Sequence, residues 1–249
     1  MKTTNVKTVK PFGMKDKMGY LFGDFGNDFT FILSTMILTK FYTDVMGISA
    51  AVIGTIMMLA RFVDAVTDVA MGRICDRCKV TPNGKFKPWL LRMCIPVSVA
   101  SFLMYQSGLA GLPTNVKIIY LAITYILWGS FCYTGINIPY GSMASAISSE
   151  PGDRQSLSTF RTMGGMLAGM VIGILLPLIA YEKITLADGT VKETLIGSRV
   201  TLAAGIFSVL AILCYLLCYK LITERVVVES NGEKAPSVGQ MLKSAFTNR

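Results

Sequence analysis

The chain has 249 residues, of which 52% are hydrophobic and only 16% charged, and its mean hydropathy is +0.53. Soluble domains carry about 25% charged residues, so this composition argues against a soluble globular protein and predicts one that crosses the membrane several times. The net charge of +9 lies mostly in the connections between apolar runs. Such placement is typical of membrane topology signals and does not favour nucleic-acid binding.

Six apolar runs, each near the length of a membrane-spanning helix, follow one another along the chain. They cover residues 18–42, 50–72, 89–109, 116–147, 157–181 and 196–223. We therefore expect an all-α membrane protein with a six-helix transmembrane bundle in residues 18–223. The fourth run is too long for one straight crossing, and Pro139 predicts a kink in it. Residues 1–17 are polar and show no cleavage signal, so the first run is expected to be a retained anchor.

Basic residues are unevenly divided between the two sides of such a bundle. One side collects the lysine-rich segment 1–17, the connection 73–88 and the segment 224–249. The opposite connections hold fewer basic residues, namely Lys40, Lys117, Lys183, Lys192 and Arg199. Because basic connections stay in the cytosol, both termini are predicted to be cytoplasmic, in a multi-pass protein of the cell (inner) membrane.

Three ionisable residues lie inside the second run. Arg61, Asp64 and Asp68 fall on one stripe of a helix, which Gly54 and Gly72 extend at either end. Each such group costs about 2.5 to 3.5 kcal/mol at the centre of a membrane helix, whereas an apolar residue returns only about 0.3 to 0.6 kcal/mol. We therefore expect the stripe to face protein rather than lipid and to mark an ion or substrate path.

A row of small residues marks the fifth run. Arg161, Gly165, Gly169, Gly173 and Pro177 recur every four residues. Glycines on one face of a helix let a neighbouring helix approach closely. Arg161 is therefore expected to lead a tight seam between two helices.

A bound metal or other cofactor is not expected. Cys75 and Cys78 form a C-x-x-C, but the chain has no histidine and no second such pair. A tetrahedral metal site built by this chain would therefore lack ligands.

Several motifs carry a family resemblance, in the same order along the chain. They are GDFGNDF at 23–29, FYTDVMG at 41–47, ARFVDAVTD at 60–68, the Met-Gly pair at 71–72 and GKFKPW at 84–89. Together they resemble the glycoside–pentoside–hexuronide:cation symporters, the branch of the major facilitator superfamily that includes melibiose permease. The similarity extends from about residue 14 into the sixth run.

The resemblance implies a site for a coupling cation. It assigns the two carboxylates of the second helix, Asp64 and Asp68, and a threonine of the fourth helix, Thr134, to Na⁺ or H⁺, with Li⁺ possible. Independently, two carboxylates one helical turn apart, about 6 Å, repel by about 3 kcal/mol at an effective dielectric near 20, which favours binding a monovalent cation or a shared proton. The alternative is a packing lock in which Arg61 neutralises one carboxylate.

The resemblance also implies a sugar site. Its aspartate of the first helix and arginine of the fifth correspond to Asp28 and Arg161, with Asp24 one turn before Asp28 and Tyr133 beside Thr134. The family's acid of the fourth helix is Asn137 here, and a later tryptophan is Gly141. These departures argue against a galactoside and leave a hexuronide, pentoside or other glycoside open. The alternative role of Asp28 and Arg161 is an ion pair that only holds helices together.

The connection between the second and third helices resembles the gating loop of the superfamily. The residues concerned are Gly72, Asp76, Arg77, Gly84 and Lys85. In the family this loop contacts the opposite half of the transporter and stabilises one orientation of it. An ordinary basic cytoplasmic loop is the alternative.

Length is the main departure from the family. Its members have twelve spans in two halves with the substrate site between them, whereas this sequence predicts six. We expect the N-terminal half of a sugar:cation symporter, with 224–249 as the start of the middle loop and with a C-terminal half or a second copy as partner. The alternative is a non-transporting receptor or packing protein. An intramembrane aspartyl protease, and with it an enzyme, is disfavoured because Asp64 and Asp68 share one helix.

Overall fold

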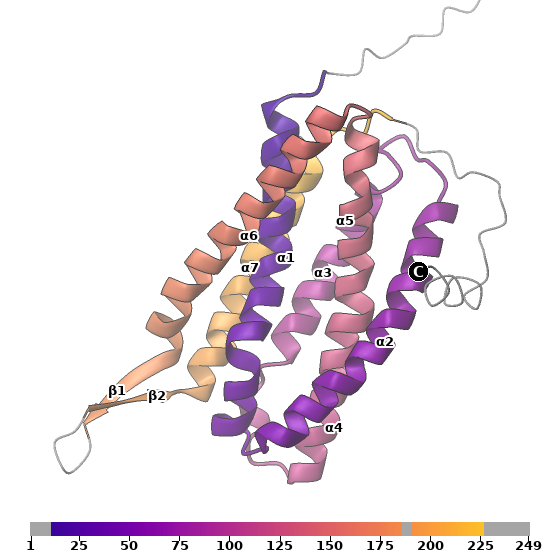
Figure 1. Cartoon of the computed structure of the whole chain (residues 1–249). Coiled ribbons are helices and arrows are strands. Elements are labelled where there is room, and N and C mark those ends of the chain that lie inside the picture. Colours follow the sequence, from indigo (N-terminus) through magenta and orange to yellow (C-terminus); the bar gives the residue numbers. More distant parts are fainter. Residues whose placement is uncertain (1–10, 186–190, 227–249) are drawn as a thin grey trace, which may run out of the picture.

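The computed structural model describes residues 11–185 and 191–226, and these form a helical bundle with one β-hairpin (Figure 1). The helices are α1 (Met14–Lys40), α2 (Ala50–Arg77), α3 (Lys87–Leu103), α4 (Thr114–Ile126), α5 (Thr134–Ile147), α6 (Pro151–Ala180) and α7 (Gly197–Leu221). Shorter helical segments are the π-helical η1 (Phe41–Val45) and η3 (Leu127–Tyr133) and the 3₁₀-helical η2 (Ser107–Leu109). Helices α4, η3 and α5 follow one another without a break, so together they form the single helical stretch predicted for the fourth run. Each of the six predicted runs then corresponds to one helical stretch.

Successive stretches run in opposite directions, so the two ends of the described chain lie at the same end of the bundle (Figure 1). A contact confirms this placement, since Arg225 Nη2 donates a hydrogen bond of 3.1 Å to the carbonyl oxygen of Pro11. The predictions for residues 1–10 and 227–249 concern parts of the chain outside the described residues.

Four of the described stretches are long and apolar enough to cross a membrane: α2, residues 114–147, α6 and α7. Helix α3 has only 17 residues, and α1 carries Asp24, Asn27 and Asp28 at its centre. The structure thus supports a multi-pass membrane protein. In a membrane, α1 would need neighbouring helices to shelter its polar groups, and α3 would need them because it is short.

The long stretch 114–147 changes geometry before its proline rather than at it. Helix α5 continues through Pro139 to Ile147, whereas the preceding segment η3 is π-helical. A π-helical turn takes an extra residue and shifts the side chains that follow, and such turns are frequent at functional sites. The departure from α-helical geometry in this stretch thus lies at 127–133, and the helix is unbroken at Pro139, where the sequence predicted a kink.

The glycine row of α6 packs against α1, as expected from the sequence. An added Cβ at Gly164 would lie 2.5 Å from the carbonyl oxygen of Leu21, and one at Gly165 would lie 2.5 Å from Asp28 Oδ2. At Gly169 and Gly173 the nearest atoms of α1 are 3.6 and 3.9 Å away, which is ordinary contact. The two helices therefore approach most closely beside Asp24 and Asp28 of α1, where both Gly164 and Gly165 leave no room for a side chain.

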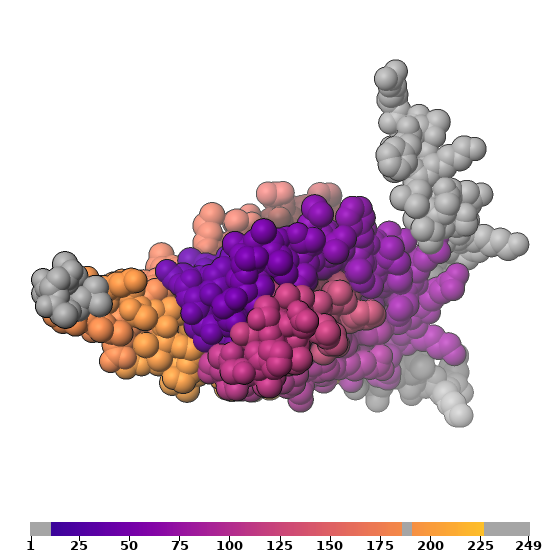
Figure 2. Space-filling model, turned by 90° about the horizontal axis from the view of Figure 1, so that it is seen from below, coloured from indigo at the N-terminus to yellow at the C-terminus, as the bar shows by residue number. Residues whose placement is uncertain are grey.

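A β-hairpin follows α6 and departs from the all-α expectation. Strands β1 (Tyr181–Thr185) and β2 (Val191–Leu195) pair antiparallel, with Lys183 opposite Glu193. β-Branched residues recur in both strands and favour this local pairing. Seen from the end where α1 and α2 meet, the hairpin projects to one side, away from α4 (Figure 2).

Helix α2 is the least covered long helix of the bundle. In its apolar window only 11% of residues are buried, against 44% in α7, and it leans away from α1 over much of its length (Figure 1). Of the predicted stripe, Asp64 is half-buried, but Arg61 and Asp68 are exposed. The prediction that the whole stripe faces protein is therefore wrong for the described bundle taken alone, because α2 packs through the neighbouring face of Ile53, Ala60, Met71 and Cys75.

Candidate functional site

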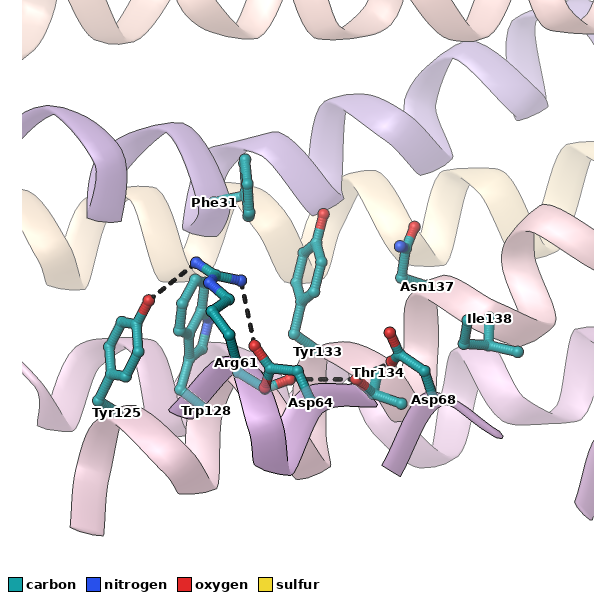
Figure 3. A pocket seen from close by; sticks show the side chains of 11 residues that line it. Phe31, Arg61, Asp64, Asp68, Tyr125, Trp128, Tyr133, Thr134, Asn137 and Ile138 are labelled. Atoms are coloured by element: carbon teal, nitrogen blue, oxygen red, sulfur yellow. Dashed lines mark hydrogen bonds and ion pairs between the residues drawn. The ribbon is translucent and has the colours of Figure 1, made fainter. Parts of the chain in front are cut away.

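A cavity of about 130 Å³ lies between α2 and the η3–α5 stretch, with Phe31 of α1 at its edge (Figure 3). It is lined by Phe31, Arg61, Asp64, Asp68, Tyr125, Trp128, Gly129, Tyr133, Thr134, Asn137 and Ile138. The two carboxylates and Thr134, which the sequence assigned to one site, thus meet here. The cavity is the point where the polar stripe of α2 reaches a second helix.

Each carboxylate of the cavity has its own hydroxyl donor. Thr134 Oγ1 donates to Asp68 Oδ1 at 2.7 Å, and Ser130 Oγ donates to Asp64 Oδ1 at 2.5 Å. Arg61 Nη1 donates to the other oxygen of Asp64, Oδ2, at 3.1 Å. We call these five residues the carboxylate cluster; its formal charge is −1, from two carboxylates and one guanidinium.

Arg61 bridges two elements at the rim of the cluster. Its Nη2 donates to Tyr125 Oη of α4 at 3.1 Å, while its side chain remains 62% exposed. The packing lock that the sequence left open is therefore present at Asp64. It does not reach Asp68, whose carboxylate is exposed and has no basic partner among the described residues. That leaves one negative charge of the pair available to a cation.

A second polar group lies deeper, between α1, α5 and α6, and we call it the arginine cluster. Arg161 Nε donates to Asp24 Oδ1 at 2.9 Å, and Arg161 Nη2 donates to Asn137 Oδ1 at 3.4 Å. Asn27 Nδ2 of α1 donates to the same Asn137 oxygen at 3.4 Å. The arginine also lies over the ring of Tyr140, 5.2 Å from its centroid.

The structure changes the partner of the arginine. The sequence left open an ion pair between Arg161 and Asp28, but within the described residues Arg161 pairs with Asp24, and Asp28 makes no hydrogen bond or ion pair. Asp28 instead faces Gly165, one turn from Arg161 along α6. A carboxylate in this position can accept hydroxyl donors from a ligand without first breaking an ion pair.

Asn137 joins the two clusters. Asn137 lines the cavity and also accepts the hydrogen bond from Arg161. Tyr133 lines the cavity too, and its ring stacks on Phe31 of α1 with centroids 5.4 Å apart. The two predicted sites are therefore adjacent and share one wall.

The connection between α2 and α3 is held by a residue that sequence reasoning missed. Glu224, just after α7, accepts backbone N–H donors from Lys85 at 2.6 Å, from Phe86 at 3.0 Å and from Lys87 at 2.6 Å. These amides lie at the N-terminus of α3, where a carboxylate is favoured by the helix dipole. Gly84 has a φ of +110°, and an added Cβ there would lie 2.5 Å from the Glu224 carboxylate carbon.

The other predicted loop residues take lesser parts. Lys85 Nζ donates to the backbone carbonyl of Asp76, not to its carboxylate, at 3.1 Å. Asp76 and Arg77 are exposed at the end of α2, and Gly72 has open space where a Cβ would be. Burial lowers the pKa of Lys87, whose Nζ donates to the carbonyl of Ile222. Nothing in the residue spacing signalled Glu224, because its partners are backbone amides.

A charged pair fastens the same end of the bundle. Arg225 Nη2 lies 2.8 Å from Asp16 Oδ2, and the two side chains are only 15% and 3% exposed. Asp16 Oδ1 also accepts the backbone N–H of Thr223 at 3.0 Å. Together Glu224 and Arg225 tie the chain after α7 to α1 and to the α2–α3 connection.

We expect Glu224→Gln to lower the stability of the chain by about 2 kcal/mol, because hydrogen bonds to a charged group are worth about 1.5 to 3 kcal/mol each and an amide accepts through one oxygen only. Thermal unfolding in detergent measures the change. Glu193→Gln is the matched control, since its ion pair with Lys183 is exposed and long at 3.9 Å, and such pairs contribute little. Equal shifts in the two variants would contradict the role of Glu224.

Comparison with known proteins identifies the class. Residues 19–249 match the family described as MFS/sugar transport protein, and the chain belongs to that family. It is 33% identical over its whole length to "Uncharacterized symporter YjmB" of Bacillus subtilis, covering 51% of that protein. It is 37% identical over 68% of its length to "Inner membrane symporter YicJ" of Escherichia coli, covering 37% of it. It is 36% identical over 64% of its length to "Glucuronide carrier protein homolog" of Escherichia coli, covering 34% of it.

These matches confirm the family expected from the motifs. The chain is a multi-pass cell-membrane protein of a transporter family, and the family is one of carriers rather than enzymes. It spans about half the length, or less, of these relatives. What the whole protein transports, and with which ion, is a matter for proposal.

Proposed function

We propose that this chain is the N-terminal half of a symporter that couples the uptake of a sugar to a monovalent cation, Na⁺ or H⁺ with Li⁺ possible. The observation that carries the proposal is the carboxylate cluster. Its two carboxylates, each with a hydroxyl donor, belong to a helix long enough to span the membrane, and both line a cavity. All of its neutral donors and acceptors are oxygens, the ligands that hard cations prefer. Asp64, Asp68 and Thr134 are its proposed ligands.

In the proposed topology the six helical stretches all cross the membrane and both termini are cytoplasmic. The end that carries Glu224, Arg225 and the basic α2–α3 connection is then the cytoplasmic one. On this basis residues 72–85 form a gating loop, which the Glu224 carboxylate ties to the chain after α7. The sugar would bind at the arginine cluster through Arg161, Asn137, Asp24 and Asp28, with Tyr133 in the shared wall.

Cation and sugar would be coupled through that shared wall. A cation beside Asp68 cancels the net charge of the carboxylate cluster and competes with Arg61 for Asp64. Asn137 lines the cavity and accepts a hydrogen bond from Arg161. A shift of Asn137 when the cation binds would therefore also move Arg161 in the sugar site. Charge-assisted hydrogen bonds from Arg161 and to Asp28 would hold sugar hydroxyls or a substrate carboxylate.

The exposed charges of α2 point to a covering partner. Arg61 and Asp68 would each cost several kcal/mol against lipid, although both are exposed on the described bundle. We propose that a second helical bundle covers them, either the other half of the same transporter or a second copy. Alternating access needs two bundles that rock around a central site.

Uptake in proteoliposomes tests the proposal. We expect the chain alone to show no accumulation above empty liposomes. Co-reconstituted with the remaining residues of the Bacillus subtilis relative, it should accumulate a labelled glycoside, pentoside or glucuronide when a Na⁺, Li⁺ or proton gradient is imposed. Binding of a sugar without dependence on any of these ions would instead favour a non-transporting receptor. Gradient-driven uptake by the chain alone, with a cross-linked dimer, would favour a self-assembling half-transporter.

A further inference from the structure

Ser130 is the one member of the carboxylate cluster that does not line the cavity. Its side chain is only 1% exposed. Its Oγ donates to Asp64 Oδ1 at 2.5 Å, so any influence of Ser130 on a bound ion must pass through Asp64. Neither the motifs nor the expected cation ligands include this residue.

Ser130 and Thr134 form a matched pair opposite the two carboxylates. The hydroxyls are four residues apart on the η3–α5 stretch, and Asp64 and Asp68 are four residues apart on α2. Equal spacing on two adjacent helices lets each carboxylate meet its own hydroxyl, at 2.5 and 2.7 Å.

The two carboxylates differ in how firmly they are held. Both oxygens of Asp64 are engaged, Oδ1 by Ser130 and Oδ2 by Arg61, whereas Asp68 accepts a hydrogen bond from Thr134 alone among the described residues. A carboxylate fixed at both oxygens cannot turn to suit ions of different size. When an ion displaces Arg61, the hydrogen bond from Ser130 is the one that still holds the Asp64 carboxylate in place.

We propose that Ser130 is a positioning residue that fixes Asp64 and thereby sets the affinity of the site for Na⁺ and its discrimination between Na⁺ and the smaller Li⁺. The inference rests on the proposed cation site and adds to it the residue that orients one ligand. Groups that orient metal ligands commonly change affinity by about 10- to 100-fold when removed. Selectivity follows because a freely turning carboxylate accommodates both ions, while a fixed one favours a single ligand distance.

Cation titration of the 249-residue chain in lipid nanodiscs tests the inference. Of the two tryptophans, Trp128 lines the cavity and Trp89 does not, so fluorescence in a Trp89→Phe background reports on the site. Choline chloride keeps the ionic strength constant while NaCl or LiCl is varied. We expect Ser130→Ala to raise the Na⁺ concentration at half-saturation by about 10- to 100-fold and to bring the Na⁺ and Li⁺ values closer together.

Three further variants complete the design. Ser130→Thr restores a hydroxyl and should recover most of the selectivity. Ser130→Cys fills the space of the hydroxyl but is only a weak hydrogen-bond donor. It should therefore show the loss of Na⁺ affinity and selectivity expected of Ser130→Ala, and it tests the hydrogen bond without leaving a void. Ser142→Ala is the matched control, because Ser142 Oγ bonds to Ile138 O of its own helix and lies away from the cavity.

The outcomes separate this inference from the proposed function. If the wild-type chain responds to Na⁺ and Asp68→Asn does not, the cation site stands; unchanged titrations of Ser130→Ala and Ser130→Cys would then overturn the role of Ser130 alone. An equal loss for Na⁺ and Li⁺ that threonine fails to restore would also overturn it, since that pattern indicates a packing defect. A wild-type chain that responds to neither Na⁺ nor Li⁺ would overturn the role of Ser130, and one that also fails to respond to a change of pH would overturn the cation site as well.

Discussion

Asp68→Asn is expected to abolish the response of the chain to Na⁺, raising the concentration at half-saturation by 100-fold or more, on the order of 3 kcal/mol. With Asp68 neutral, the carboxylate cluster has no net charge, because Arg61 already pairs with Asp64 at 3.1 Å. A monovalent ion would then have to leave water for a neutral site. Titration of Trp128 fluorescence in nanodiscs measures the loss.

The structure makes Asp68 a cleaner test than Asp64. Asp64→Asn leaves one acceptor oxygen for two donors, Ser130 and Arg61, so this variant should lose cation binding together with some stability. Asp44→Asn is the control, because Asp44 is an exposed carboxylate in η1, 4.0 Å from Lys40, and lies outside the cavity. An undiminished Na⁺ response in both Asp64→Asn and Asp68→Asn would remove these residues from the cation site.

The carboxylate cluster was largely predictable because its spacing is local. Asp64 and Asp68 share a helix face by periodicity alone, and the resemblance supplied Thr134, which the structure places 2.7 Å from Asp68. Ser130 was not predictable in the same way. Its register opposite Asp64 depends on the π-helical turn at 127–133, and no periodic pattern in the sequence signals that turn.

The arginine cluster shows what depends on rotation between helices. Asp24 and Asp28 lie one turn apart on α1, so sequence spacing allows either to meet Arg161. The contacts of Gly164 with Leu21 and of Gly165 with Asp28 fix the rotation of α6 relative to α1. In this packing Arg161 forms its ion pair with Asp24. The pairing of β1 with β2 and the contacts of Glu224 were missed because strand pairing and backbone N–H donors leave little trace in an apolar, helix-dominated sequence.

The fastening at one end of the bundle bears on how the chain could move. Glu224 and Arg225 tie α7 to α1 and to the N-terminus of α3, so these three helices are linked at that end by charged contacts. Helix α2 is sparsely buried and carries the carboxylates. In the proposed transporter, α2 is thus the element whose position an ion and a covering bundle influence most.

Arg161→Ala is expected to abolish binding of the sugar while cation binding survives. Two charge-assisted hydrogen bonds to a ligand are worth about 1.5 to 3 kcal/mol each, so affinity should fall by about 100-fold or more. The carboxylate cluster does not include Arg161, and its contacts remain. The measurement pairs binding of a labelled sugar to the co-reconstituted complex with the Trp128 titration by Na⁺.

A second variant separates a substrate role from a packing role. Arg161→Ala leaves Asp24 without its partner at a position where only 11% of its side chain is exposed, and an orphaned buried charge is strongly destabilising. Arg161→Ala combined with Asp24→Ala removes both charges and should restore the thermal stability without restoring the sugar. If the double variant binds sugar as the wild type does, Arg161 only holds α6 against α1. If it folds, binds Na⁺ and still fails to bind sugar, the pair of Arg161 and Asp24 binds the substrate and does more than hold the two helices together.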